Sequence, residues 1–528
     1  MNLQRLYETI RHLKWQQVFY RFYYPVKRAF FRTSGVSENS LAAAAGFPQI
    51  RMPFIAVTGL FRPGDNSFCF LNSRHRFQET IEWDYKDHGR LWCYNLNYFE
   101  WLLDEQVPIT DRCTTIYSFL KTPVSQRRTS AEPYPISLRS IHWILFLGKY
   151  NIKGTTILQT LHRDLQHLSA FPEYHIAGNH LLENAFAIFC GAHFFNEKKW
   201  FLQSKALLSK QLEEQILPDG GHYELSPMYH ALVLYRLLIC IGLAKDSGRF
   251  ADKEFNRFLS DKAAEMLGWL KAFSFENGSF AKMNDAAENI APANVAIFRL
   301  AEFLNICSRK TNLKECGYRK IKGEKWELLL DVGNILPDYQ PGHAHADTFS
   351  FCLNVDSKPL IVDTGVSSYA NDPTRQMERG TAAHNTISVS GKNSSDVWSA
   401  FRTGRRARVK ILEETTHSLR AKHDGYKYLN VFHERDFSWA EHKIEIKDEI
   451  TQTSKENIYT LLHFHPSVIL NKIADNIYMA NDTCISLHGA KSINIEEYQF
   501  NNSFNERKLA KKLVGIAGNS TTIVIVLN

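Results

Sequence analysis

Pro341-Gly342-His343-Ala344-His345-Ala346-Asp347 is the stretch around which the 528-residue chain is organised. In an extended strand, residues two positions apart point to the same face, so a strand here places His343, His345 and Asp347 on one side. The alanines between them leave that face unscreened, and Pro-Gly predicts a turn at its start. A short polar loop is the alternative, because a single His-x-His is not a closed ligand set.

Two later segments contain further candidate metal ligands. Residues 360–365 form an apolar run that contains Asp363, and His384 precedes the β-branched run 387–389. His345, Asp363 and His384 are two imidazoles and a carboxylate, a common zinc ligand type that leaves a position for water. We expect a chiefly structural Zn²⁺ that holds the neighbouring His343 in place, with Asp347 as an acceptor for an imidazole N–H. In the alternative, the three residues only hydrogen-bond one another around a water.

The rest of the chain predicts an α+β protein with more than one domain, since its length exceeds that of a usual single core. Helical periodicity dominates from about residue 91 to 308, and successive helices with short loops predict α/α hairpins. The Lys-rich residues 309–325 are interpreted as a linker, and short alternating strands follow, typical of an antiparallel sandwich. The predicted parts are an N-terminal segment 1–90, a helical catalytic domain 91–315 and a β-sandwich 325–528. The predicted helices include 155–168, 179–195, 198–216, 259–273 and 292–307, with Ser137 and Ser226 as N-caps, and the predicted strands include 349–355, 358–362, 386–389, 406–412, 426–432, 443–446 and 458–464.

Composition narrows the functional classes. Lys and Arg exceed Asp and Glu by 63 − 55 = 8, which suits an acidic polysaccharide but is also ordinary for soluble proteins. No long single-sign run indicates a nucleic-acid partner. The nine cysteines are scattered without a Cys-x-x-Cys pair, which favours a reducing compartment. The oligomeric state is not indicated.

The N-terminal residues 1–31 contain no apolar run typical of a signal peptide, and no window of the chain predicts a transmembrane segment. We therefore expect a cytoplasmic protein, with a periplasmic or membrane-peripheral location as alternatives. Residues 15–31 are rich in Tyr, Phe and basic side chains. They predict either a helix packed on the main body or a basic amphipathic helix at a membrane surface.

The order of several motifs resembles the heparinase II/III family of polysaccharide lyases. The resemblance covers residues from about 92 to about 407 and implies an incomplete α/α toroid followed by an antiparallel β-sandwich. It also implies cleavage of a uronic-acid-containing polysaccharide by β-elimination. Many relatives are exported, so the missing signal peptide is a departure that leaves the location open. The matching segments are 179–184, 219–230, 342–347, 361–365, 381–386 and 398–407.

Such a lyase must neutralise a carboxylate, remove the adjacent proton and protonate the leaving oxygen. Asn179 is the candidate neutraliser because an amide can donate without adding negative charge. His180 could share this role, and Glu183, one helical turn on, could orient His180. Hydrogen bonds between helices are the alternative for all three.

Two residues are candidates for proton transfer. Ser226 and Pro227 begin a helix, which puts Tyr229 at its positive end and predicts a lowered phenol pKa. The resemblance assigns proton transfer to Tyr229, and His343 is expected to be the second group. The alternative for Tyr229 is a structural residue near the helix cap.

Four further residues are candidates for substrate binding. Arg139 could grip a carboxylate or sulfate with its planar fork, or form a salt bridge within the helices. His222 lies on a turn before the helix of Tyr229, Tyr369 is an additional phenol, and Arg402 lies in a segment that carries the resemblance.

Two other functions remain open beside the lyase. One is a low-turnover polysaccharide-binding or assembly protein of capsule or exopolysaccharide production. The other is a zinc-dependent glycan hydrolase, in which the metal activates water. Elimination creates an unsaturated uronate that absorbs in the ultraviolet, hydrolysis does not, and a binding protein yields neither product.

Overall fold

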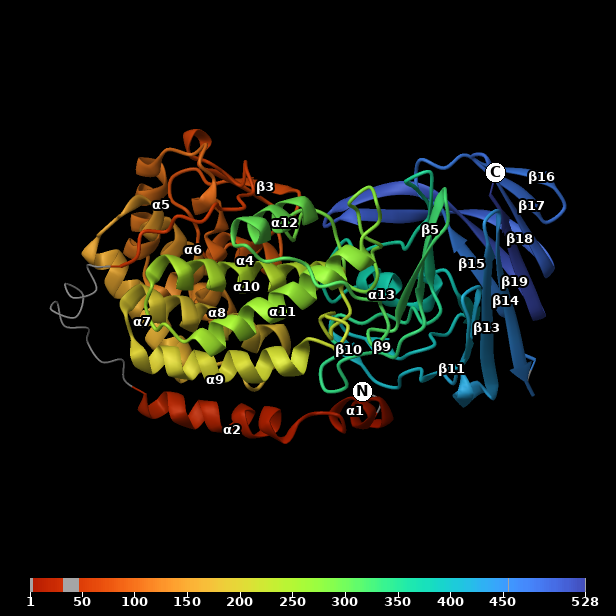
Figure 1. The fold of residues 1–528 in the computed structure, drawn as a ribbon, viewed down its shortest axis with the longest axis horizontal. Helices are drawn as coiled ribbons and strands as arrows, with labels where there is room; N and C mark the ends of the chain where they lie inside the picture. Colours follow the sequence, from red (N-terminus) through yellow and green to blue (C-terminus); the bar gives the residue numbers. More distant parts are fainter. Residues whose placement is uncertain (1–2, 32–46, 454, 528) are drawn as a thin grey trace.

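The computed structural model describes residues 3–31, 47–453 and 455–527. A helical domain formed by the N-terminal half stands beside a β-rich C-terminal domain, and the chain between them runs through long loops (Figure 1). The α+β class and the order of the two parts are confirmed.

The helical domain is an incomplete α/α toroid. Neighbouring helices pack in pairs, α8 against α9 and α10 against α11, while α6 packs against both α7 and α8. Buried apolar side chains on each helix join one large core. The helices are α4 (Arg90–Tyr98), α5 (Ile109–Lys121), α6 (Pro133–Tyr150), α7 (Thr155–Ala170), α8 (Gly178–Phe195), α9 (Lys198–Gln215), α10 (Pro227–Ser247), α11 (Lys253–Phe273) and α12 (Asn294–Phe303).

Helix α10 packs against α8, α11 and α12. Among the described residues it is the one helix long and apolar enough to cross a membrane, and 89% of its most apolar window is buried. That burial is the property of a core helix. Its N-terminus is fixed by Ser226, whose hydroxyl accepts a hydrogen bond from the Tyr229 N–H at 3.3 Å, as predicted.

The predicted cap at Ser137 is wrong. Helix α6 begins four residues earlier, at Pro133, because a proline at the first helical position loses no hydrogen bond and already has a helical φ. Ser137 lies inside the helix, and its hydroxyl donates to the Pro133 carbonyl at 2.9 Å.

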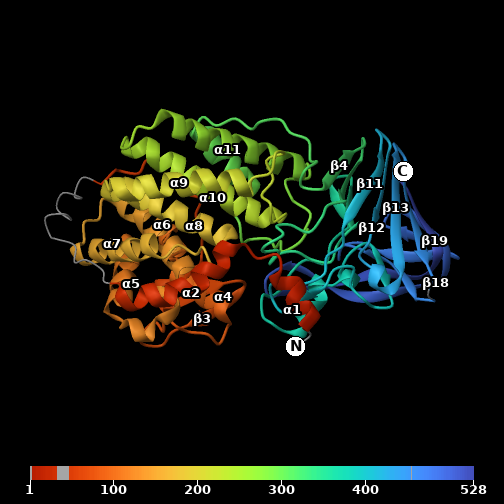
Figure 2. The ribbon, with the colours of Figure 1, turned by 90° about the horizontal axis from the view of Figure 1, so that it is seen from below.

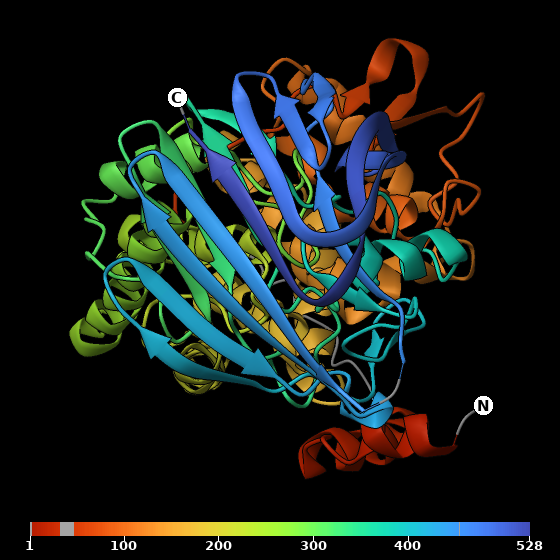
Figure 3. The same ribbon diagram turned by 90° about the vertical axis from the view of Figure 1, so that its right-hand side faces the viewer.

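The C-terminal domain is built on a ten-stranded antiparallel sheet in the order β11-β12-β13-β14-β19-β18-β17-β16, with β15 pairing with β19 and β8 (Figure 3). A second sheet has the order β4-β5-β6-β7. The strands of the large sheet are β8 (Ile387–Val389), β11 (Val409–Glu414), β12 (Ser418–His423), β13 (Val431–Ala440), β14 (Lys443–Gln452), β15 (Ile458–His463), β16 (Leu470–Ala474), β17 (Ile477–Ala480), β18 (Thr483–Ser503) and β19 (Glu506–Val526); those of the small sheet are β4 (Tyr318–Lys322), β5 (Trp326–Asp331), β6 (Phe351–Val355) and β7 (Lys358–Ile361).

The two sheets share one core and so form a sandwich. Leu328 and Phe351 of the small sheet belong to the same buried cluster as Phe437, Ile446 and Ile523 of the large sheet. Alternating residues of both inner faces fill the space between them.

Several predicted elements of this domain need correction. Strand β4 lies inside the stretch 309–325 that was interpreted as a linker, and β5, β12 and β16 were not predicted. In the predicted strand 426–432, only the last two residues belong to β13. Residues 343–347 are turns and loop rather than a strand, because Pro341-Gly342 and the buried polar contacts of the histidines bend the chain.

The N-terminal segment contains two helices, α1 (Leu3–Ile10) and α2 (Trp15–Phe30), and a small sheet of β1 (Phe61–Arg62), β2 (Ser67–Phe70) and β3 (Ser73–Arg76). Helix α2 lies along the helical domain, whereas α1 lies against the β-rich domain (Figures 1 and 2). Residues 32–46 of the predicted segment 1–90 are outside the described residues.

Candidate active site

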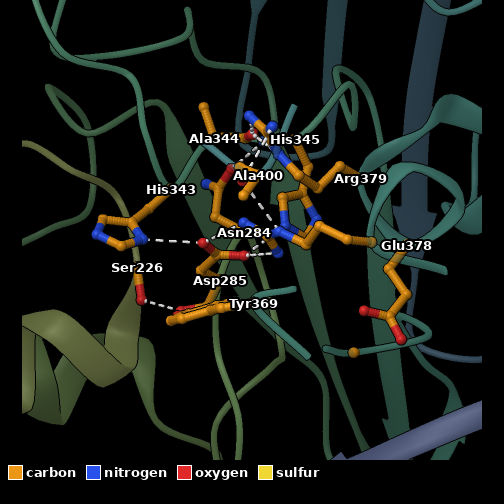
Figure 4. Close-up of polar contacts among 12 residues, drawn as sticks. Ser226, Asn284, Asp285, His343, Ala344, His345, Tyr369, Glu378, Arg379 and Ala400 are labelled. Atoms are coloured by element: carbon orange, nitrogen blue, oxygen red, sulfur yellow. Dashed lines mark hydrogen bonds and ion pairs between the residues drawn. The ribbon is translucent and has the colours of Figure 1, made fainter. Parts of the chain in front are cut away.

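A buried carboxylate, Asp285, joins the polar residues between the two domains (Figure 4). Nδ1 of His343 donates to its Oδ2 at 2.8 Å, and Nε2 of His345 donates to its Oδ1 at 2.9 Å. Both terminal nitrogens of Arg375 donate to the same carboxylate, Nη2 at 2.6 Å. Burial alone would raise the pKa of Asp285, but Arg375 and the two imidazoles outweigh it and hold that pKa well below its usual range. Asp285 is therefore an ionised centre that orients both histidines.

This contact determines the tautomer of His343. A carboxylate can only accept, so Nδ1 of His343 carries a proton, and in the neutral imidazole the lone pair is on Nε2. Nε2 lies 3.7 Å from Oε2 of Glu224. An imidazole oriented in this way by a buried aspartate has the arrangement of a general base.

Tyr229 lies directly against His343. The two ring centroids are 3.9 Å apart with an interplanar angle of 31°. The Tyr229 hydroxyl donates to the Tyr369 hydroxyl at 3.3 Å, which brings that predicted phenol into the same site. The predicted lowering of the phenol pKa is wrong: burial, then the neighbouring Tyr369, raises the pKa of Tyr229 well above its usual value. Tyr229 is thus a protonated phenol at neutral pH.

The N-terminus of α8 borders this pair. The backbone N–H of Asn179 donates to Oε1 of Glu224 at 3.2 Å, so Glu224 lies between Asn179 and His343. Next to Asn179, the His180 ring packs on Tyr134 with ring centroids 4.4 Å apart. Asn179, Tyr229 and His343, predicted from distant parts of the chain, are therefore brought together.

Glu173, and not Glu183, orients His180. Nδ1 of His180 lies 3.2 Å from Oε1 of Glu173. Burial lowers the pKa of His180, but the charge of Glu173 outweighs it and the pKa is raised. Glu183 instead faces Arg236 at 3.6 Å, and burial raises the pKa of Glu183 to about 7.

Three residues with positive φ flank this site. Ala177 has φ +65° and ψ −153°, and it lies two residues before Asn179. Leu225 (φ +56°) immediately precedes Ser226, and Asn284 (φ +56°) immediately precedes Asp285. Such conformations cost roughly 1–3 kcal/mol each and persist where the surroundings enforce them, as at functional sites.

The expected metal ligands are neighbours. Nδ1 of His384 lies 2.7 Å from Oδ2 of Asp363, and the rings of His345 and His384 have centroids 5.4 Å apart. Burial lowers the pKa of His345 to about 4, so this imidazole is neutral at neutral pH. Its Nδ1 is buried and has no hydrogen-bond partner, and the same holds for Nε2 of His384 and Oδ2 of Asp347. In the described ranges, no three His, Cys, Asp or Glu side chains are already arranged as a metal site.

Two predicted substrate-binding residues are buried and do not face solvent. Arg139 is buried within the helices, where its Nη2 donates to Asp164 at 2.7 Å and its Nη1 to the Ser130 carbonyl, which is the alternative considered for it. His222 is 1% exposed and lies 3.0 Å from Gln215, because the turn before α10 folds inward. Arg402 lies on β10 (Arg402–Thr403), where it is exposed.

Sequence reasoning missed Asp285, Arg375, Glu173 and Glu224. Glu224 stands in the matching segment 219–230, which was the available signal. Asp285 and Glu173 lie in loops. Asp285 is 58 residues before His343, and Glu173 is in the loop before the helix of His180, so no sequence motif links either carboxylate to its histidine. Arg375 lies in α13 (Pro373–Arg379), a short helix with no distinguishing pattern.

Comparison with known proteins gives matches over most of the chain. The family model described as "Heparinase II/III N-terminus" matches residues 133–314, and "Heparinase II/III-like, C-terminal" matches residues 308–525. A heparin-sulfate lyase of Pedobacter heparinus is 26% identical over an alignment of 270 residues that covers 45% of this chain and 39% of that protein. A heparin-sulfate lyase of Bacteroides stercoris is 24% identical over an alignment of 380 residues that covers 64% of this chain and 54% of that protein. The matches thus span about half or less of the length of these curated relatives.

Solved structures share the fold over nearly the whole chain. A heparinase III structure has a TM-score of 0.62 at 15% identity and covers 99% of this chain and 93% of its own. The heparan sulfate lyase of Pedobacter heparinus has a TM-score of 0.54 at 16% identity and covers 97% of this chain and 88% of its own. At these identities the likeness concerns the fold. Since the two sequence models together match residues 133–525, the chain belongs to the heparinase II/III family.

Proposed function

We propose that this protein is a lyase that cleaves a uronic-acid-containing acidic polysaccharide by β-elimination. The observation that carries the proposal is the contact between His343 and Tyr229. One group is an imidazole whose free nitrogen is fixed by an ionised aspartate, and the other is a phenol held protonated by burial. A β-elimination requires a base for the C5 proton and an acid for the leaving oxygen, and these two groups lie side by side.

The proposed reaction breaks two bonds and forms one double bond. Nε2 of His343 takes the proton at C5 of the uronate, next to its carboxylate. The electron pair of that C–H bond forms the C4=C5 double bond, and the C4–O glycosidic bond breaks. The leaving oxygen takes the phenol proton of Tyr229. Because the two rings are in contact, a proton can afterwards return from the imidazolium to the phenolate.

Residues at the N-terminus of α8 are proposed to stabilise the charge that develops on the carboxylate. Asn179 would donate its amide, and His180, whose pKa is raised by Glu173, would supply positive charge. The positive end of the helix dipole adds to both. Exposed Arg402 is proposed as a contact to the polyanion outside the reacting sugar.

We also propose that His345, Asp363 and His384 bind one Zn²⁺ with a structural role. The support is the neutral, unpartnered Nδ1 of His345, whose other nitrogen is held by Asp285, an arrangement typical of metal-ligating histidines. When bound, the ion would pin the segment that carries His343. It has no part in the proposed proton transfers.

A screen of acidic polysaccharides tests the lyase proposal. Heparan sulfate, chondroitin sulfate, alginate and bacterial capsule glycans are incubated with the protein, and the ultraviolet absorbance of unsaturated uronate is followed. We expect absorbance with at least one polymer and its loss in His343→Ala. Reducing ends that increase without absorbance would replace the lyase with a hydrolase, and glycan binding without either product would favour the binding protein.

Elemental analysis tests the metal separately. After purification without chelators, we expect about one zinc per chain in the wild type and much less in His345→Ala and His384→Ala. Arg139→Ala, in a buried ion pair elsewhere, is the matched control and should retain zinc. A wild type without stoichiometric metal would remove zinc and leave these residues held by hydrogen bonds alone.

A further inference from the structure

Helix α2 turns an apolar stripe toward solvent. Its exposed apolar residues recur at intervals of three and four, so they lie on one face of the helix. Trp15 is 74% exposed, Phe22 73% and Phe30 81%, values unusual for side chains of this size. The stripe consists of Trp15, Val18, Phe19, Phe22, Tyr23, Val26 and Phe30.

The opposite face of α2 is the one that docks on the protein, through hydrogen bonds and the rings of two tyrosines. The Tyr24 hydroxyl donates to the Pro172 carbonyl at 2.5 Å, and the Gln17 amide donates to the Ile176 carbonyl at 3.0 Å. Tyr20 stacks on Tyr174, with ring centroids 4.6 Å apart. An ordinary surface helix buries its apolar face and exposes its polar one. In helix α2, by contrast, the apolar stripe is exposed and the opposite face is docked.

Helix α1 repeats this arrangement. Leu3, Tyr7 and Ile10 are exposed and lie on one face by their spacing, and no residue of α1 is buried. On another side of the helix, Arg5 donates to Asp396 of the β-rich domain at 2.8 Å. Both helices lie along the same side of the molecule, below both domains (Figures 1 and 3).

Basic residues border the apolar stripe of α2. Arg21 and Arg28 are exposed, whereas Lys27 donates to the Ala170 carbonyl on the docking face. The helix contains no acidic residue. A stripe of Trp, Tyr and Phe with basic residues at its edges matches an anionic bilayer, whose headgroups attract the cations and whose acyl boundary accepts the rings.

We propose that α1 and α2 form a binding site for the surface of an anionic lipid bilayer, on which the protein lies as a peripheral protein. A second copy of the chain fits less well, because a two-fold contact would bring the basic borders together. An acidic polysaccharide would satisfy the cations but not the exposed rings. The proposal does not depend on the lyase activity.

Sedimentation with lipid vesicles tests this site. The probes are vesicles of phosphatidylcholine mixed with phosphatidylglycerol and vesicles of phosphatidylcholine alone. We expect the full chain to sediment with the anionic vesicles, and less so at high salt. Trp15→Glu with Phe22→Glu should lower the partition coefficient about tenfold or more, because the stripe can no longer insert. Arg21→Gln with Arg28→Gln should lower it about tenfold on the anionic vesicles.

The control variant replaces two exposed apolar residues by glutamate on the β-rich domain, away from α1 and α2. Ile469 and Leu509 are 68% and 56% exposed on the β-rich domain, so Ile469→Glu with Leu509→Glu should sediment like the wild type. Thermal unfolding checks that all variants are folded. The proposal is overturned if the wild type stays in solution, if the control loses binding as much as the helix variant, or if light scattering shows a dimer that Trp15→Glu with Phe22→Glu dissociates.

Discussion

At the scale of single residues, the site depends on one buried charge. Asp285 accepts from His343, His345 and Arg375, so a single carboxylate orients the candidate base and one candidate zinc ligand. Removing a buried charge that others depend on leaves its partners uncompensated, which costs more than the pair itself contributes. Two substitutions test the proton donor and the buried charge separately.

The first is Tyr229→Phe, which removes only a hydroxyl. The ring that packs on His343 remains, so we expect an unchanged unfolding midpoint. Turnover of an active polysaccharide should fall by about two to four orders of magnitude, because the leaving oxygen loses its proton donor. A variant with a near-wild-type rate would release Tyr229 from its role.

The second is Asp285→Asn, which keeps the size of the side chain and removes its charge. We expect a loss of stability of roughly 3–5 kcal/mol, because Arg375 stays buried without its counterion. Turnover should also fall, because the imidazole of His343 loses its orienting carboxylate. Asp164→Asn, which breaks the remote pair with Arg139, is the control: it should cost stability and leave turnover unchanged.

At the scale of elements, long periodic helices were predictable and the site loops were not. The predicted ranges 155–168, 179–195 and 198–216 match α7, α8 and α9 within about two residues at each end, because apolar residues recur at helical spacing in each of them. Strand β5 was missed since all of its residues are buried, which leaves no alternation to detect. His343 and Tyr229 were identified because they lie in motifs. Their common partner Asp285 is defined only by tertiary contacts.

The start of α10 gives a prediction at this scale. Ser226 caps the helix and donates to the Asp285 carbonyl at 2.5 Å, which ties the helix of Tyr229 to the loop of Asp285. Ser226→Ala should cost roughly 0.5–2 kcal/mol and reduce turnover. Asp252→Ala removes the cap of α11, far from the site, and should cost similar stability without loss of turnover. Equal turnover in both variants would mean that the cap does not position Tyr229.

At the scale of the whole molecule, the β-sandwich holds the loops that carry the candidate zinc ligands. Arg435 on β13 donates to the Phe349 carbonyl at 2.8 Å and to the Asn385 carbonyl at 2.9 Å, next to the segments of His345 and His384. Its other nitrogens donate to Asp448 on β14 at 2.6 and 2.8 Å. The large sheet therefore fixes, through one buried ion pair, the loops that carry the candidate ligands.

The pH dependence of stability reports on this ion pair. Burial would raise the pKa of Asp448, but Arg435 outweighs it and lowers that pKa to about 2. A depressed carboxylate pKa stabilises the folded state above the unfolded pKa, and the contribution disappears as the pH falls through the folded pKa. The wild type should thus lose roughly 2 kcal/mol from this group between about pH 4 and pH 2. Asp448→Asn should be less stable at neutral pH, and its deficit should shrink over the same interval, since protonated Asp448 resembles asparagine. Unfolding free energies of both proteins from pH 5 to pH 2 provide the measurement, and a deficit that stays constant with pH would show that the pKa of Asp448 is not depressed in the folded protein.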